Sequence, residues 1–152
     1  PYVTYFHSSQ YINDLANGEV CVALGWSGDI LQAADRAREA GNGVQVEYRI
    51  PREGGVIWFD MLAIPVDARN VDNAHRFIDF LLRPDVIAEV SAHVKYANPN
   101  LAADGLVPAD IRDDPAIYPP DEVRDRLFTM GVSPPKVERA MTRAWTAVKT
   151  GR

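Results

Sequence analysis

One segment of this chain, residues 54–65, has the composition and the boundaries of a strand buried within a sheet. It opens with two glycines, continues through Val, Ile, Trp, Phe, Met and Leu, and stops at Pro65. An apolar run between glycines and a proline is typical of a buried strand. Its one charged residue is Asp60, and because side chains two positions apart lie on one face, Trp58 projects beside it.

The side chains of Trp58 and Asp60 allow two interpretations. A carboxylate in an apolar strand is unfavourable unless it is paired or faces a polar cleft. An aromatic ring beside an acid suits an organic cation, because the ring face attracts the charge and the carboxylate accepts charge-assisted hydrogen bonds. In the other interpretation, Trp58 belongs to the core and Asp60 caps a turn or pairs with an arginine. The strand by itself favours this second interpretation.

Helical and strand patterns alternate along the first half of the chain. Residues 8–18 predict a short helix, residues 19–25 a buried strand, and residues 26–41 a second helix that glycine ends. This order places residues 26–29 at the carboxyl end of a strand, where open α/β sheets bind ligands. Residues 44–50 alternate apolar and polar side chains, which predicts a strand with one wet face.

The second half is mostly helical in pattern. Apolar stripes predict helices over residues 71–81 and 86–94, and over a last helix that starts at residues 133–135. The Pro-, Ala- and Asp-rich residues 98–120 predict a loop with short helical turns, and residues 121–128 predict a small helix.

Composition limits the function classes. With 152 residues and 47% apolar content, the chain can bury the core of one ordinary domain. Its net charge of −5 argues against nucleic acid as a partner and favours cationic ligands. Cys21 is the only cysteine, so it cannot form an internal disulfide, and its apolar neighbours predict that it is buried. No apolar run approaches the ~20 residues of a membrane span.

Most site chemistries lack their motifs. The histidines His7, His75 and His93 are scattered without metal-ligand spacing, and no phosphate-binding glycine loop occurs, so neither a metal nor a cofactor is expected. Two carboxylates that could face one cleft, Asp29 and Asp60, would suit a glycoside- or ester-cleaving enzyme. Nothing else in the chain favours an enzyme.

Several motifs together resemble one family. They are Gly25-Trp-Ser-Gly-Asp29, Trp58-Phe-Asp60, Leu81-Leu-Arg-Pro-Asp85, Tyr96-Ala-Asn98 and Ile117-Tyr-Pro-Pro120, besides the segment of residues 8–18. In order and spacing the chain resembles the carboxyl-terminal part of the periplasmic polyamine receptors of ABC importers, the putrescine-binding members above all. The resemblance covers essentially the whole chain but less than half of such a receptor, whose amino-terminal portion would then be missing here.

The resemblance implies an α/β fold of the type II periplasmic-binding-protein class, in which two lobes close on the ligand about a hinge. Residues 1–40 would form part of the second lobe, residues 41–95 part of the first lobe, and residues 96–152 would return to the second.

The resemblance also implies the site. Trp26 and Asp29 would face the cleft from one lobe, Trp58 and Asp60 from the other, and Tyr96 would lie near the crossover. The acids would take the ammonium ends of a polyamine, and the aromatic rings would line its methylene chain. Putrescine receptors are expected to have Phe where this chain has Trp58, so the identity of the polyamine stays open.

The expected function is therefore that of a non-enzymatic periplasmic receptor, which hands a polyamine to an ABC permease in the membrane. Two alternatives remain. One is a hydrolase that uses Asp29 and Asp60. The other is a fragment with no ligand binding of its own, because half a cleft and unpaired strand edges would depend on a complementary chain, the missing amino-terminal part of the receptor.

Overall fold

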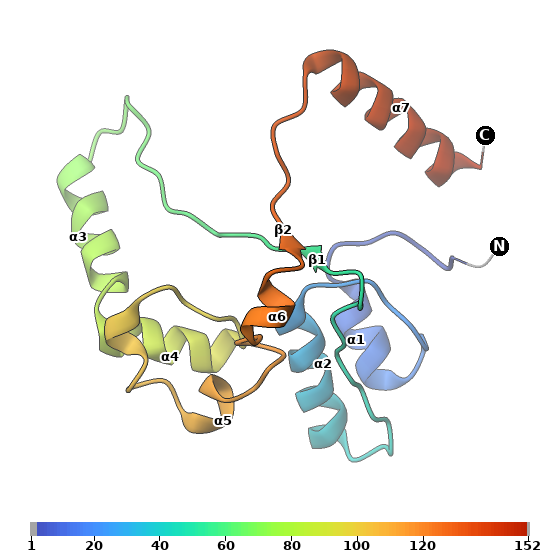
Figure 1. Ribbon diagram of the computed structural model, residues 1–152, viewed down its shortest axis with the longest axis horizontal. Helices are drawn as coiled ribbons and strands as arrows, with labels where there is room; N and C mark the ends of the chain where they lie inside the picture. The colour runs from blue at the N-terminus through green and yellow to red at the C-terminus, as the bar shows by residue number, and fades with distance from the viewer. Residues whose placement is uncertain (1–2, 152) are drawn as a thin grey trace.

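The computed structural model describes residues 3–151 and is mostly helical (Figure 1). Its elements, in chain order, are α1 (Gln10–Asn17), α2 (Ser27–Ala40), β1 (Gly55–Val56), α3 (Val71–Leu81), α4 (Pro84–Val94), the 3₁₀ turn η1 (Leu101–Ala103), α5 (Ala109–Arg112), α6 (Asp121–Arg124), β2 (Leu127–Phe128) and α7 (Pro135–Thr150). The longer predicted helices are confirmed, and so are the short helical turns within residues 98–120. The helix predicted over residues 121–128 is shorter, because α6 ends at Arg124 and β2 follows.

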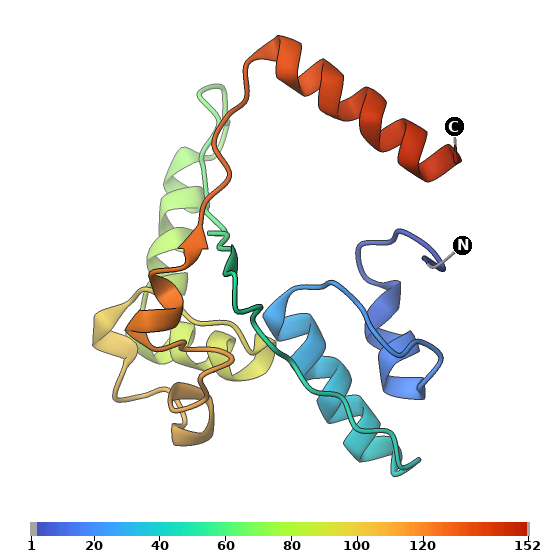
Figure 2. The same cartoon turned by 45° about the vertical axis from the view of Figure 1, so that its right-hand side comes forward.

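The first two helices pack side by side and form one of two small cores (Figure 2). The backbone N–H of Gly18, at a φ of 76°, bonds to two carbonyls in the last turn of α1 and ends that helix. Between α1 and α2 lie four buried side chains, those of Tyr11, Leu15, Ile30 and Ala33. Val46 and Tyr48 of the following segment pack on this core, whereas the polar residues Gln45, Glu47 and Arg49 are exposed. The predicted wet and dry faces of residues 44–50 are therefore present.

A second core lies under the loop that follows α4. Ala88 of α4 packs with Ala103, Val107, Ile111 and Ile117. Leu31 of α2 packs against the same cluster, so α2 touches both cores. This double contact makes α2 the element that connects the two halves of the chain.

The predicted strands are largely absent from residues 3–151. Only β1 and β2 pair, in parallel and over two residues each, and residues 19–25, 44–50 and 57–65 lie in no sheet. A strand exists only where a neighbour supplies the other half of its hydrogen-bond ladder. Within the described residues these segments find one such bond, from the N–H of Ile57 to the carbonyl of Phe128 at 2.9 Å, directly after β1. Leu24 and Met61 are 98% and 85% exposed, and Cys21 is exposed, so the prediction that residues 19–25 and 54–65 form buried strands is wrong.

Helix α7 projects away from both cores (Figures 1 and 2). The rings of Phe6 and Trp145 meet edge to face, with centroids 4.7 Å apart. The rest of the predicted apolar stripe, at Val137, Met141 and Val148, stays 45–60% exposed. The stripe is thus present but uncovered by residues 3–151. None of the described helices is long and apolar enough to cross a membrane.

Candidate functional site

Asp29 lies in the first turn of α2 and accepts hydrogen bonds from two phenols. The hydroxyl of Tyr11 donates to Oδ2 at 2.5 Å, and that of Tyr96 donates to Oδ1 at 3.1 Å. The three residues come from α1, from α2 and from the segment that follows α4. A carboxylate at a helix N-terminus is further stabilised by the free backbone N–H groups and the helix dipole. The fold therefore brings together residues from distant parts of the chain, so that two phenols hold the half-buried carboxylate of Asp29 in place.

Trp26 is the residue directly before α2, and its backbone is fixed on both sides. Its N–H donates to the hydroxyl of Tyr11 at 3.3 Å, and its carbonyl accepts from the N–H of Ile30 at 3.1 Å. The side chain of Trp26 remains 49% exposed. A half-exposed indole ring thus belongs to the residue one helical turn before Asp29.

The glycines of the Gly25-Trp-Ser-Gly-Asp29 motif make room for the two tyrosines. A Cβ at Gly25 would lie 2.5 Å from the ring of Tyr11, and a Cβ at Gly28 would lie 2.3 Å from the ring of Tyr96. Both distances are far below van der Waals contact, so either side chain would displace a ring. The motif is explained by these two close approaches.

Both phenols remain donors at neutral pH. Burial, and then the hydrogen bond to Asp29, raises the pKa of Tyr11 to about 12. Burial, and then the negative charge of Asp29, raises the pKa of Tyr96 well above its usual range. Each hydroxyl therefore keeps the proton that it donates to the carboxylate.

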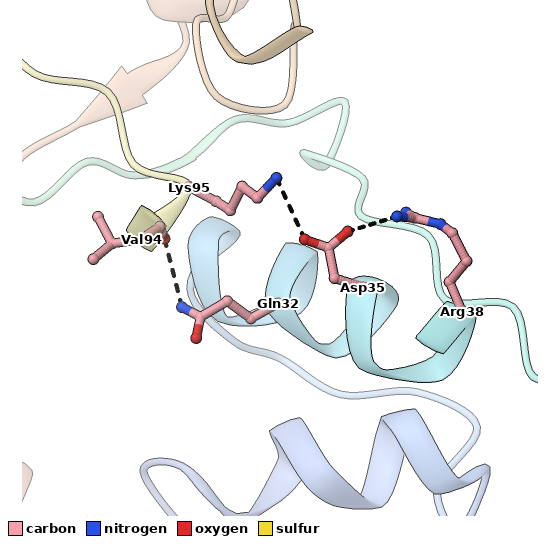
Figure 3. A network of polar contacts seen from close by, with 5 residues as sticks. All are labelled: Gln32, Asp35, Arg38, Val94 and Lys95. Carbon is pink, nitrogen blue, oxygen red and sulfur yellow. Dashed lines mark hydrogen bonds and ion pairs between the residues drawn. The ribbon is translucent and has the colours of Figure 1, made fainter. Parts of the chain in front are cut away.

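Further along, α2 also holds the segment that carries Tyr96 (Figure 3). Gln32 donates to the carbonyl of Val94 at 3.5 Å, and Asp35 pairs with Lys95 at 3.3 Å and with Arg38 at 2.9 Å. Lys95 ends α4 in a left-handed conformation with a φ of 61°, the only non-glycine residue with a positive φ in the described part of the chain. This turn leads the chain from α4 to the position where Tyr96 reaches Asp29.

The structure does not join Trp58 and Asp60 to this group. Trp58 is 63% exposed and Asp60 is exposed as well, on the extended segment that follows β1. Within residues 3–151, Asp60 forms no hydrogen bond or ion pair, so the arginine partner considered from the sequence is not found there. Trp58 does not belong to a core either. Of the predicted site residues, Trp26, Asp29 and Tyr96 come together.

Sequence reasoning missed Tyr11, which lies within the helix predicted over residues 8–18. Its side chain is only 5% exposed. A buried tyrosine nevertheless needs a partner for its hydroxyl. This requirement could have marked Tyr11 as a residue with a polar partner, but the pattern of α1 alone does not identify that partner as Asp29.

Other hollows lie elsewhere. One of about 210 Å³ is lined by α2, Lys95 and the region of α5, and another of about 320 Å³ by residues 69–73. Neither is lined by Trp26, Asp29 or Tyr96. In the described residues, His, Cys, Asp and Glu side chains form no group of three that could hold a metal ion.

Comparison with known proteins identifies the family. The profile of the bacterial extracellular solute-binding proteins matches residues 2–119. The putrescine-binding periplasmic protein PotF of Escherichia coli K12 is 58% identical over all 152 residues, and the putrescine-binding periplasmic protein SpuD of Pseudomonas aeruginosa UCBPP-PA14 is 55% identical over the same length. A putrescine/agmatine-binding protein of Pseudomonas aeruginosa PAO1 is 44% identical over 99% of the chain. The chain spans 41% of the length of each of these relatives, all of which are named for binding and none for catalysis. The chain belongs to the family of bacterial extracellular solute-binding proteins.

Proposed function

We propose that this chain supplies part of a periplasmic receptor that binds a putrescine-like polyamine and hands it to an ABC permease. The observation that carries the proposal is the carboxylate of Asp29, held by two phenols beside the half-exposed ring of Trp26. The relatives are named for binding putrescine, which is a ligand of the same class, a small organic dication.

The proposed site has the acceptors that an ammonium group needs. The two oxygens of a carboxylate offer about four lone-pair positions, and Tyr11 and Tyr96 occupy one on each oxygen. One position on each oxygen is left for the ligand. The ring of Trp26 would add a cation–π contribution of ~0.5–2 kcal/mol, depending on how well the site excludes water.

The second ammonium is assigned to Asp60, with Trp58 beside it. In this proposal residues 1–40 and 96–152 belong to one lobe and residues 41–95 to the other, as in the type II periplasmic-binding fold, and closure about the crossover brings the acids to opposite ends of the polyamine. The carboxylate of Asp60, which has no partner within residues 3–151, and the exposed ring of Trp58 are compatible with this role, because both side chains are available to a ligand.

The remaining portion of the receptor would complete the cleft. The exposed apolar side chains at Val22, Leu24 and Met61 lie on segments with strand patterns but without ladder partners among residues 3–151. The apolar stripe of α7 is uncovered as well. An amino-terminal portion that supplies neighbouring strands would cover these surfaces, and without it the isolated chain would bind polyamines weakly.

Titration calorimetry tests this function. Putrescine and spermidine are titrated into the chain alone and into a joined receptor, in which the amino-terminal portion of the E. coli relative precedes this chain. We expect strong binding only in the joined receptor. Asp29→Asn would leave an ammonium unpaired at a cost of ~3–5 kcal/mol, so affinity would fall at least about a hundredfold.

The matched control is Asp14→Asn. Asp14 lies on α1 and accepts a hydrogen bond from the hydroxyl of Tyr5 at 2.5 Å, the same distance as that from Tyr11 to Asp29. This variant should bind putrescine as the unmodified receptor does. A folded joined receptor that gives no heat with either amine, or an Asp29→Asn variant with unchanged affinity, would refute the proposed function.

A further inference from the structure

We propose that Tyr11 is a positioning residue of the polyamine site, whose single phenol oxygen fixes Trp26 and Asp29 relative to each other. The inference rests on the proposed function and extends it to a residue that would not touch the ligand.

The hydroxyl oxygen of Tyr11 on α1 binds two residues at the start of α2. The hydroxyl of Tyr11 donates to Oδ2 of Asp29 at 2.5 Å and accepts from the N–H of Trp26 at 3.3 Å. The N–H of the residue before a helix has no partner within the helix, so the phenol satisfies a group that would otherwise be free. One oxygen thus sets both the direction of the carboxylate and the path of the chain from which the indole projects.

The ring of Tyr11 is itself immobilised. It is 5% exposed and packs with Leu15, Ile30 and Ala33 in the core between α1 and α2. The close approach of Gly25, where a Cβ would lie 2.5 Å from the ring, leaves no space for it to shift toward that segment. Packing between α1 and α2 therefore fixes the position of the hydroxyl, and the hydroxyl in turn positions Trp26 and Asp29 at the start of α2.

Phenylalanine would preserve the packing and remove both hydrogen bonds. A lost hydrogen bond to a charged group in a site of this kind is expected to weaken putrescine binding about tenfold in the joined receptor. Tyr5→Phe is the matched control, because Tyr5 donates an equally short hydrogen bond to Asp14 and, within residues 3–151, forms no hydrogen bond with Trp26 or Asp29. Binding by this variant should change less than about twofold.

A double-mutant cycle separates positioning from general stability. With Asp29→Ala already present, the Tyr11 hydroxyl has no carboxylate to orient and keeps only its bond with the N–H of Trp26, so adding Tyr11→Phe should lower the affinity by a smaller factor than in the unmodified receptor. A loss of the same factor in both backgrounds would mean that Tyr11 acts only through the fold and would overturn the inference. Urea denaturation of each variant checks that the proteins compared are folded.

If Tyr11→Phe does not fold, 3-fluorotyrosine at position 11 gives the test. The fluorine resonance should shift when putrescine saturates the joined receptor, and should not shift in the Asp29→Asn variant. An unchanged resonance in the unmodified background overturns the inference.

Different results would refute the positioning role of Tyr11 and the polyamine-binding function. Unchanged binding by Tyr11→Phe, together with loss of binding by Asp29→Asn, would refute the positioning role and leave the proposed function standing. Absence of putrescine binding by the unmodified joined receptor, or unchanged binding by Asp29→Asn, would refute the function and the inference with it.

Discussion

Replacing Gly28 by alanine probes the contact between α2 and the segment that carries Tyr96. A Cβ at position 28 would lie 2.3 Å from Cε2 of Tyr96 and 2.6 Å from Cδ2 and Cζ. The ring cannot turn away without giving up its hydrogen bond to Asp29, because the hydroxyl lies 3.1 Å from Oδ1. The substitution therefore forces either overpacking or the loss of that hydrogen bond.

The expected cost follows from these terms. Overpacking of a buried site costs about 1–3 kcal/mol, and alanine recovers at most about 1 kcal/mol in helix propensity. Loss of the hydrogen bond from Tyr96 to Asp29 would add about 1.5 kcal/mol or more. We expect Gly28→Ala to lower the free energy of unfolding by about 1–3 kcal/mol.

Urea denaturation of the joined receptor measures this change. Gly105→Ala is the control, because a Cβ at Gly105 meets no atom within 4 Å and its backbone has no positive φ. It should alter the free energy of unfolding by less than about 0.5 kcal/mol. If Gly28→Ala is as stable as Gly105→Ala, the close packing of Tyr96 on α2 is wrong.

Three further predictions address other contacts. The hydrogen bond to Asp14 raises the pKa of Tyr5 to about 12, and that of Tyr11 is also about 12, so absorbance titration should show tyrosines ionising near pH 12. Unfolded tyrosine ionises near pH 10 and folded Tyr11 near pH 12, so the stabilisation that Tyr11 gives is complete below about pH 10 and is lost as the pH rises to 12. A free energy of unfolding that stays constant between pH 10 and 12 would contradict the raised pKa of Tyr11. Exposed Cys21 should react with a thiol reagent at the rate of a free thiol in the isolated chain and much more slowly in the joined receptor, and equal rates would argue against coverage of residues 19–25. Lys95→Gly should change the free energy of unfolding by less than about 1 kcal/mol, because glycine relieves the left-handed backbone and so offsets the lost ion pair with Asp35. Lys95→Val keeps the unfavourable backbone and should lower the free energy of unfolding by about 1–2 kcal/mol. Equal stability of the two variants would contradict the left-handed conformation at position 95.

The chain's helices could be predicted from the sequence because each satisfies its own backbone hydrogen bonds. Apolar spacing located α1, α2, α3, α4 and α7, and glycines such as Gly18 and Gly41 marked where two of them end. The alternation of residues 44–50 likewise predicted which side chains pack inward. These are local properties, and the sequence alone determined them.

The candidate site was predictable in part. The Gly25-Trp-Ser-Gly-Asp29 motif and Tyr96 stood out in the sequence, and the structure brings Trp26, Asp29 and Tyr96 together. The ligand role of these residues, and that of Trp58 and Asp60, stays a prediction.

Tertiary structure decided what depends on distant partners. A strand pattern becomes a strand only where another segment completes its ladder, and within residues 3–151 this happens only between β1 and β2. Tyr11 had the pattern of a core residue, and only the packing of α1 on α2 brought its hydroxyl to Asp29. Sequence periodicity reports which face of an element is buried, whereas the partner of a polar group on that face is fixed by the packing of elements far apart in the chain.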